Sequence, residues 1–532
     1  MNRGILHCFD KLVTNRLRAD ATLLRSQSFK RADCRLEGTA SSAIAMILFY
    51  NPKATRHRNR RLPLSVLSIA AMLEGKEEYA IVDGNLDPHP TESLLTLLKE
   101  RTVELLAVTV MPGPQTVGAV ASCREIRERF PNLPIVWGGY FASNYTAAAL
   151  NAKYVDYAVR GQGEHTFVEL LEAVRGNRDL KTINGLSYKD SDGVVRHNPE
   201  RPMRSPGEFP WYPYHAVRVD QYLLPTFLGK RTAVHQASIG CPYRCNFCGV
   251  VTFSGSREKM EPPARTEAML RHLVEKYGVD AVQFYDNNFF LREDHSRELA
   301  DRLAPLKMRW WCEGRIDIMM KYSDATFEAI RRAGCTMIFF GAESGSNENL
   351  KEMNKDLCAE DTLALASRIR SFGIIPEFSI IFGNPKDPEG DTRDCIKFIR
   401  QLKRLNPDSE IIVEHYTPVP QRARMYGNVE DKVQFPTTPD EWATDHWQRF
   451  ATQKDPQTPW LRPRTKQLID NFELVVSSRW PTVQDLRLPR WGRLALKALS
   501  SWRYQWGVYT APLELRWVQQ FIALRKPKEE SL

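Results

Sequence analysis

The stretch Gly240–Val250 reads GCPYRCNFCGV and contains three cysteines, Cys241, Cys245 and Cys248, at the spacing C-x3-C-x2-C. It directly follows an apolar segment that we expect to be a β-strand, so the cysteines belong to a loop at the carboxyl end of that strand. Three thiolates on so short a loop can bind one side of a cubic iron–sulfur cluster and leave one iron without a protein ligand. The alternatives are a zinc site that lacks its fourth ligand and three unrelated thiols.

Short apolar segments alternate with helices on the carboxyl side of the cysteines. The helices expected at Thr266–Tyr277 and Ser323–Ala333 are each followed by a glycine, which is typical of a helix end. Six strand–helix units favour a partial (β/α)6 barrel over an open sheet. The strands of this barrel are expected to end at Ile239, Phe284–Tyr285, Trp310–Trp311, Met337–Phe340, Phe378–Phe382 and Ile411–Glu414.

A similar alternation precedes the cysteines. The helices expected there are Leu64–Leu73 and Val117–Phe130. Short apolar strands separated by helices imply right-handed crossovers and a parallel sheet that is covered on both faces, so we predict a doubly wound α/β domain. Its strands are expected at Ala43–Tyr50, Tyr79–Val82, Leu105–Val110, Ile135–Trp137 and Tyr157–Val159.

Changes in composition divide the chain into five parts. Eight of the 12 tryptophans lie between Trp442 and Trp517, which indicates a separate, mostly helical C-terminal region. Its segment 487–506, RLPRWGRLALKALSSWRYQW, is either a basic amphipathic surface that touches membrane lipid or helical core with Arg and Lys at its edge. The expected parts are a disordered N-terminal extension (1–40), the doubly wound domain (41–176), a hairpin with a Pro-rich linker (177–225), the barrel (226–430) and the C-terminal domain (431–532).

Composition limits the class of protein. A chain of 532 residues, 42% hydrophobic and 26% charged, is long enough for two to four folded domains, and this excludes disorder of the whole chain. No apolar run reaches the length that crosses a bilayer, and the N-terminus lacks the pattern of a secretory signal, so we expect a cytoplasmic protein. Ten cysteines are too few for a disulfide scaffold. The net charge of +10 permits an anionic partner, but no motif predicts specific binding of nucleic acid.

The cysteine motif, with the strand before it, resembles that of the radical S-adenosylmethionine (SAM) enzymes. In that superfamily the three cysteines hold a [4Fe-4S] cluster, and its open iron chelates the amino and carboxylate groups of SAM. Phe247 matches the aromatic residue that usually precedes the third cysteine. The resemblance implies reductive cleavage of SAM to a 5′-deoxyadenosyl radical, which abstracts a hydrogen atom from the substrate. It also implies an electron donor such as flavodoxin or ferredoxin.

The same resemblance assigns SAM contacts to the carboxyl ends of later strands. Asp286 and Asn287 follow the second strand, in the position that the family uses for the SAM amino group. Arg315 follows the third strand and is a partner for the SAM carboxylate. The segment that contacts ribose, and the loop after the fifth strand, supply Glu343, Ser344 and Gly383.

The first domain resembles the cobalamin-binding domain that precedes the barrel in one class of radical SAM enzymes. Residues 48–74, LFYNPKATRHRNRRLPLSVLSIAAMLE, match the opening strand, the Asn-Pro loop and the Pro-Leu helix start of that class. Glycines at the carboxyl edge of the sheet would let a bulky nucleotide tail approach the backbone. The residues that this resemblance assigns to the cofactor are Asn51, Asp83, Thr109, Gly113, Gly138, Gly139, Gly161 and Glu164.

The loop after the first strand departs from one version of this domain. Cobalamin domains that ligate cobalt through histidine carry Asp-x-His-x-x-Gly there, whereas this chain has Asn51-Pro52-Lys53. His57 and His89 lack the flanking pattern, and we interpret both as surface residues. We therefore expect cobalamin to bind without a histidine ligand to cobalt.

Together the resemblances imply a cobalamin-dependent radical SAM enzyme, and a methyltransferase at an unactivated carbon is the favoured activity. Methylcobalamin would donate its methyl group to a substrate radical, and a second SAM would restore it. The alternative is an anaerobic oxidative cyclase of the magnesium-protoporphyrin monomethyl ester cyclase type. A second alternative is a cobalamin or SAM sensor, for which a low-potential cluster would serve no purpose.

The substrate is expected to contact the C-terminal region, because the barrel motifs bind SAM and the first domain binds cobalamin. The aromatic and basic composition of that region suggests a large apolar or anionic molecule, such as a lipid, a tetrapyrrole or a peptide natural product. The same composition is compatible with contact between the C-terminal region and the inner membrane surface.

Overall fold

A computed structural model describes residues 45–55, 59–419, 432–451, 458–482 and 488–521. The chain divides into two units, Met1–Ile44 and Ala45–Leu532, and all described elements belong to the second. The extension predicted for residues 1–40 lies outside the described residues. Among the described helices, none combines the length and apolarity needed to cross a membrane.

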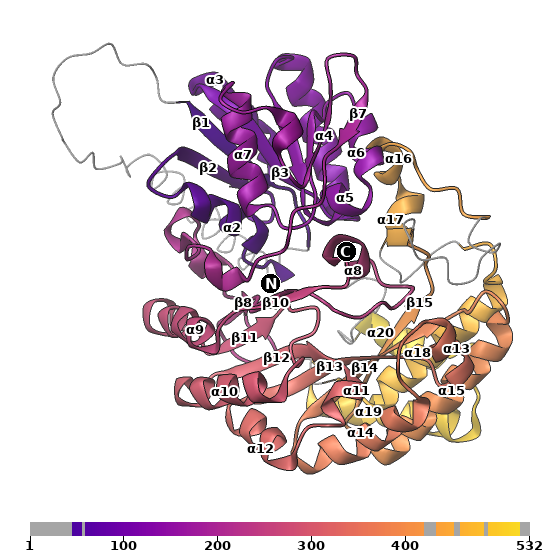
Figure 1. Cartoon of the computed structure of the whole chain (residues 1–532). Coiled ribbons are helices and arrows are strands. Elements are labelled where there is room, and N and C mark those ends of the chain that lie inside the picture. Colours follow the sequence, from indigo (N-terminus) through magenta and orange to yellow (C-terminus); the bar gives the residue numbers. More distant parts are fainter. Residues whose placement is uncertain (1–44, 56–58, 420–431, 452–457, 483–487, 522–532) are drawn as a thin grey trace, which may run out of the picture. The chain divides into compact units, whose positions relative to one another are not determined.

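The first half of the described chain folds around a seven-stranded sheet with the order β2-β1-β3-β4-β5-β6-β7 (Figure 1). The first five strands in this order are parallel, and β6 and β7 add an antiparallel hairpin at the edge. The predicted hairpin and parallel sheet are therefore confirmed. The strands are β1 Met46–Asn51, β2 Glu78–Asp83, β3 Val103–Thr109, β4 Ile135–Gly138, β5 Tyr157–Val159, β6 Leu186–Lys189 and β7 Val195–His197.

Helices cover both faces of this sheet, as a doubly wound fold requires. Alternate residues of β1 point to opposite faces, because Leu48 packs with the buried leucines of α3 while Phe49 packs with Phe167 of α7. The helices α3 and α4 share one core, and α2 and α7 share the other. The helices are α2 Leu64–Leu73, α3 Pro90–Glu100, α4 Pro114–Arg129, α5 Gly139–Asn144, α6 Thr146–Asn151 and α7 Glu164–Val174.

The second sheet has six parallel strands in the order β8-β11-β12-β13-β14-β15. β8 and β15 are the two edges of this sheet, so the barrel is partial, as predicted. The strands are β8 Thr232–His235, β11 Ala281–Phe284, β12 Arg309–Gly314, β13 Cys335–Glu343, β14 Ile375–Phe382 and β15 Glu410–His415. The helices are α8 Val250–Ser254, α9 Pro263–Tyr277, α10 Glu293–Leu303, α11 Ile316–Met319, α12 Asp324–Arg332, α13 Asn347–Glu352, α14 Ala359–Ser371 and α15 Pro388–Leu405.

The first barrel strand is shorter than predicted. β8 ends at His235, and the apolar residues expected to continue it to Ile239 belong instead to β9 (Ser238–Gly240). β9 pairs antiparallel with β10 (Glu258–Met260), so the chain leaves the barrel before it reaches the cysteines. The cysteine loop and α8 are therefore held between the two strands of a small ribbon.

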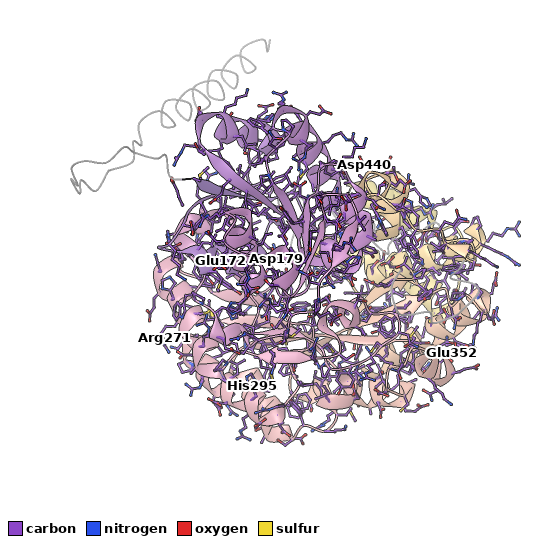
Figure 2. The ribbon with its side chains drawn as sticks, turned by 45° about the horizontal axis from the view of Figure 1, so that its top comes forward. Glu172, Asp179, Arg271, His295, Glu352 and Asp440 are labelled. Carbon is purple, nitrogen blue, oxygen red and sulfur yellow. The ribbon has the colours of Figure 1, made fainter. Side chains whose placement is uncertain are left out.

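The C-terminal helices do not form a separate packing unit, which differs from the predicted domain at residues 431–532. Ile469 and Phe472 of α18 and Leu496 of α19 belong to the same hydrophobic core as the barrel. Trp442 of α16 packs into the core of the first sheet, and Asp440 of the same helix pairs with Arg124 of α4 (Figure 2). The helices are α16 Pro439–Trp442, α17 Asp445–Ala451, α18 Pro463–Arg479, α19 Arg490–Trp506 and α20 Leu513–Phe521.

Candidate active site

The three cysteines lie on one loop between β9 and α8. Cys245 is buried, while Cys241 and Cys248 are half-buried. Burial, together with the charges of the neighbouring Cys245 and Cys241, raises the pKa of the Cys248 thiol to about 12. The three thiols are therefore close enough for their charges to interact, and such proximity is required of residues that bind the same cluster. Among the described residues, no three His, Cys, Asp or Glu side chains already converge as ligands of a single metal ion.

Arg315 supports this loop from β12. Its guanidinium lies 3.4 Å from the centre of the Tyr243 ring, and Nη1 is 3.5 Å from the sulfur of Cys245. The same side chain donates to Asp317 at 2.9 Å and to the backbone oxygen of Lys355 at 2.7 Å. A buried cation at this position offsets the negative charge that thiolates bound to iron would carry. Arg315 was assigned to the SAM carboxylate, and the structure places it against the cysteine loop.

Lys355 is a second buried cation at this site, and it belongs to no motif that would identify it from the sequence. Its Nζ donates to Glu343 Oε1 at 2.8 Å and lies 5.7 Å from the centre of the Phe247 ring. Glu343 adopts a φ of 61°, which is rare for a residue other than glycine. A Cβ on Gly341 would overlap the Glu343 carboxylate, so this glycine makes room for the ion pair. The predicted ribose contact Glu343 therefore has a partner within the chain.

The predicted residues Ser344 and Gly383 have local structural contacts. Ser344 is buried, and its hydroxyl accepts a hydrogen bond from the backbone of Ser346 at 3.1 Å. Gly383 has a φ of 87°, and its N–H donates to Asp391 at 2.8 Å. Both loops are thus shaped by their own backbone contacts at the carboxyl ends of β13 and β14.

Asp286 presents a carboxylate oxygen without a partner. It follows β11, is fully buried, and accepts one hydrogen bond at Oδ2 from the N–H of Ala237 at 3.2 Å. Its Oδ1, and both ends of the buried amide of Asn288, have no hydrogen-bond partner within the described residues. Burial raises the pKa of Asp286 to about 6. Buried polar atoms without a partner in the protein usually bind a ligand or an ordered water molecule. The other predicted residue here, Asn287, is half-buried beside them.

Two further carboxyl groups share this environment. Burial, together with the charge of Asp286, raises the pKa of Glu258 to about 8. Glu313 of β12 has its pKa raised to about 8 by burial and by the nearby Asp286 and Glu377. Neither residue could be identified from the sequence, because only the pairing of the strands brings the carboxyl groups together.

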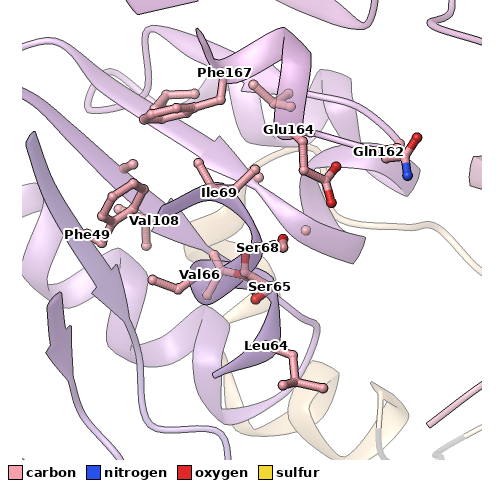
Figure 3. A pocket seen from close by; sticks show the side chains of 18 of the residues that line it. Phe49, Leu64, Ser65, Val66, Ser68, Ile69, Val108, Gln162, Glu164 and Phe167 are labelled. Atoms are coloured by element: carbon pink, nitrogen blue, oxygen red, sulfur yellow. Dashed lines mark hydrogen bonds between the residues drawn. The ribbon is translucent and has the colours of Figure 1, made fainter. Parts of the chain in front are cut away.

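A cavity of about 220 Å³ lies at the carboxyl edge of the first sheet, beside α2 and α7 (Figure 3). Its walls are apolar around Phe49, Ile69 and Phe167, while Ser65, Ser68 and Glu164 contribute polar groups. An apolar cavity of roughly 150 Å³ holds a benzene ring, so this cavity has room for a bicyclic aromatic base. Gln236 and Ile239 also line it, and they come from the segment between β8 and the cysteines.

Five of the residues assigned to the first domain's cofactor line this cavity, namely Thr109, Gly138, Gly139, Gly161 and Glu164. A Cβ on Gly138 would meet no atom within 4 Å, so this glycine faces open space. Gly139 has a φ of 85°, and a Cβ there would come within 3.0 Å of the backbone oxygen of Val110. Burial raises the pKa of Glu164, which favours its neutral, hydrogen-bond-donating form.

The other three assigned residues, Asn51, Asp83 and Gly113, are not among those that line the cavity. Asn51 and Asp83 are buried, and their side chains are joined by a hydrogen bond of 3.0 Å. Gln115 donates to Asn51 at 2.8 Å, and Tyr222 of the linker donates to Asp83 at 2.5 Å. This network fixes the carboxyl ends of β1 and β2 and ties the linker to them.

Of the two histidines predicted to lie on the surface, the structure describes His89 alone, and His89 is not among the residues that line the cavity. His57 lies outside the described residues. His89 precedes α3, and its side chain is exposed beside Glu92. The residues that line the cavity include no histidine within the described part of the chain.

Tyr140 joins the two halves of the site. It follows the Gly138–Gly139 turn of the first sheet, and its hydroxyl packs against the backbone of Gly249, the residue after Cys248. Its ring also contacts Phe253 of α8, with 6.3 Å between ring centres. A Cβ on Gly249 would overlap the Tyr140 hydroxyl, so only glycine permits this approach. The cysteine loop thus lies directly against the glycine-ended edge of the first sheet.

Comparison with known proteins agrees with this two-part site. The model of the radical SAM superfamily matches residues 236–399, and that of the B12 binding domain matches residues 59–171. An uncharacterised methyltransferase of Pyrococcus horikoshii is 27% identical over 64% of this chain and 73% of its own length. The anaerobic magnesium-protoporphyrin IX monomethyl ester cyclase of Synechocystis is 24% identical over 74% of this chain and 78% of its own.

A solved structure shares the fold. The radical SAM methyltransferase TsrM of Kitasatospora setae, with tryptophan and a SAM analogue bound, superimposes with a TM-score of 0.64. The similarity covers 89% of this chain and 99% of TsrM at 18% sequence identity. The order and packing of the two sheets are therefore those of a known architecture.

Proposed function

The chain belongs to the cobalamin-dependent radical SAM enzymes, and we propose that it is a methyltransferase that acts at an unactivated carbon. The sequence relatives include methyltransferases and cyclases, and the solved structure that shares the fold is a methyltransferase. The observation that carries the proposal is the junction of Tyr140 with Gly249, because it sets the cysteine loop against the cavity at the edge of the first sheet.

Cys241, Cys245 and Cys248 would hold a [4Fe-4S] cluster, with Phe247 beside the third cysteine. The chain fits this group, because its thiols are gathered on one loop and two buried cations, Arg315 and Lys355, balance negative charge there. When bound, the cluster and SAM supply a radical that abstracts hydrogen from carbon.

Side chains at the strand ends would hold SAM. Asp286 offers its unpaired oxygen to the ammonium group of SAM, and the amide of Asn288 can accept or donate a further hydrogen bond. A cationic ligand would lower the pKa of Asp286 again, so that the carboxylate is charged when the ligand is present. Asn287, Ser344 and Gly383, in the loops that follow β11, β13 and β14, would supply further SAM contacts.

The cavity at the edge of the first sheet would hold the nucleotide tail of cobalamin. Gly138 and Gly161 leave space for it, and Thr109 and Glu164 offer hydrogen bonds at its rim. When bound, cobalamin supplies a transferable methyl group. Asn51 and Asp83 would not contact cobalamin themselves. Their hydrogen-bond network would instead hold in place the strand ends that form the rim of the cavity. We expect no histidine ligand to cobalt from this chain.

Side-chain contacts join the two halves of the site at the borders of the space between these groups. On the side of α8, Tyr140 packs against the cysteine loop. Elsewhere, Arg61 from the loop before α2 donates hydrogen bonds to Gln283 at 3.2 Å and to Tyr285 at 3.1 Å. A closed space protects a reactive radical from quenching by solvent. A reduced flavodoxin or ferredoxin in the cytoplasm would supply the electron for SAM cleavage.

The fate of SAM tests the proposed function and separates it from the oxidative cyclase. The full-length protein, reconstituted anaerobically, is incubated with methyl-deuterated SAM, a reductant and candidate substrates of the lipid, tetrapyrrole and peptide classes. A methyltransferase makes equal amounts of S-adenosylhomocysteine and 5′-deoxyadenosine and places the deuterated methyl on the product. Accumulation of 5′-deoxyadenosine in step with a product that lacks the deuterated methyl would refute methyl transfer and support the cyclase.

A further inference from the structure

Helix α19, labelled in Figure 1, carries four large apolar side chains that are exposed to solvent. Trp491 is 66% exposed, Leu494 69%, Trp502 43% and Trp506 76%. Single exposed apolar residues are ordinary on protein surfaces, but a contiguous group of this size marks an interaction site. The structure supports part of each interpretation of this segment, because one face of α19 packs into the core while the large side chains of the other face are exposed.

The four residues occupy one face of the helix. Their positions are separated by three, eight and four residues, and Ala498, exposed between Leu494 and Trp502, completes the helical spacing. At 1.5 Å per residue the row is about 22 Å long. The opposite face is buried, with Leu496 in the barrel core and Arg503 paired with Glu514 of α20. Because the inner face is anchored, the tryptophan row cannot turn inward without unfolding the helix from the core.

The charged residues that are exposed on α19 and on the described part of α20 are all positive. Arg490 and Lys497 are exposed beside the tryptophan row, and α19 contains no acidic residue. Arg516 is exposed on α20, whose one acidic residue is Glu514, already paired with Arg503. Leu513 and Trp517 of α20 are also exposed, at 67% and 62%. Basic residues flanking tryptophan and leucine are typical of helices that lie in the interface of an anionic membrane.

A second copy of the chain would fit this surface poorly. A symmetric dimer through α19 would place two copies of the same basic face against each other, with no acidic residue on either helix to offset the charge. An anionic bilayer instead meets the cations with phosphate groups, and the indole rings with the boundary between headgroups and acyl chains.

We propose that the α19 surface, formed by Trp491, Leu494, Trp502 and Trp506 with the flanking Arg490 and Lys497, binds the surface of an anionic phospholipid bilayer. The protein lies on the membrane, and the rest of the fold stays in water. This surface is separate from the cysteine loop and the cavity, so the proposal stands or falls independently of the proposed function.

Vesicle flotation with the full-length protein tests the proposal. Vesicles of phosphatidylglycerol and phosphatidylcholine in equal parts should carry the protein to the top of a density gradient, and raised salt should weaken the binding. Replacing Trp491 or Trp506 by Ser should weaken binding about tenfold each, because each exposed indole loses apolar burial worth about 1.5 kcal/mol. Trp211→Ser is the matched control, since Trp211 is an exposed tryptophan of the linker that contacts His272 of α9.

Bromine-labelled acyl chains supply an independent readout of depth, because they quench tryptophan fluorescence only on contact with the bilayer interior. The quenching should fall in Trp506→Ser and stay unchanged in Trp211→Ser. The proposal is wrong if the protein does not float with anionic vesicles, or if Trp491→Ser and Trp506→Ser float as the parent does. Dimerisation that these two substitutions abolish, without vesicle binding, would assign the surface to a second copy instead.

Discussion

The contact between Tyr140 and Gly249 can be tested by substituting both partners. The backbone of Gly249 has φ −69° and ψ −13°, which alanine adopts without strain, so any effect of Gly249→Ala comes from the added methyl group. That methyl would occupy the position of the Tyr140 hydroxyl. Overpacking of this kind costs about 1–3 kcal/mol. In a cooperative unit of roughly 200 residues, this corresponds to a fall in Tm of about 2–12 °C.

The double variant distinguishes this overlap from a general loss of stability. Tyr140→Ala alone removes packing against Phe253 and costs about 2–5 kcal/mol. Since the alanine at position 249 then meets empty space, the double variant should be no less stable than Tyr140→Ala. The coupling free energy between the two sites is then about 1–3 kcal/mol.

Thermal unfolding of the protein without cofactors, followed by near-ultraviolet circular dichroism, supplies the four Tm values. Gly138→Ala is the control, because a Cβ there meets no atom within 4 Å. It should leave the Tm unchanged. Additive losses in the double variant, or an unchanged Tm in Gly249→Ala, would show that the two halves of the site do not meet at this contact.

Further substitutions test the charges and the cavity. Gly138→Ala should weaken cobalamin binding about tenfold in a titration, because its methyl group enters the cavity while the unloaded fold is unaffected. Lys355→Met should destabilise the protein by about 3–5 kcal/mol in denaturant unfolding, since it leaves Glu343 buried without a partner, and the double variant with Glu343→Gln should recover part of this loss. The stability that Glu313 contributes as a neutral acid should be lost as pH rises from about 4.5 through about 8, so Glu313→Gln should flatten the dependence of unfolding free energy on pH in that window. His89→Ala should leave the EPR hyperfine pattern of bound cobalt unchanged, and loss of nitrogen coupling in this variant would identify His89 as a lower ligand.

The sequence predicts the fold because the relevant signals are local. The helix Leu64–Leu73 has the predicted bounds, and α9 ends at Tyr277 before Gly278, because apolar spacing and a helix-ending glycine lie within a few residues of each other. β8 was predicted too long, since the apolar residues before the cysteines suit either a barrel strand or a short ribbon. Only the pairing of β9 with β10 decides between them.

The parts of the site that were missed depend on contacts between distant segments. Tyr140 and Gly249 lie in different domains of the predicted organisation, and although Gly249 directly follows the third cysteine, no sequence pattern pairs it with Tyr140. Lys355 becomes significant only when β13 brings Glu343 beside it. The C-terminal helices were predicted as a separate domain because their composition changes abruptly, but composition does not reveal that Phe472 packs into the barrel core.

The measurement that tests the shared site most directly is EPR spectroscopy of the full-length protein loaded with both the reduced cluster and Co(II) cobalamin. Because the cysteine loop packs against the edge that would bind cobalamin, the two paramagnets should broaden or split each other's signals, and the Cys241→Ala, Cys245→Ala, Cys248→Ala triple variant should restore the isolated cobalt spectrum. Two signals that simply add, each identical to that of the singly loaded protein, would contradict a common active site.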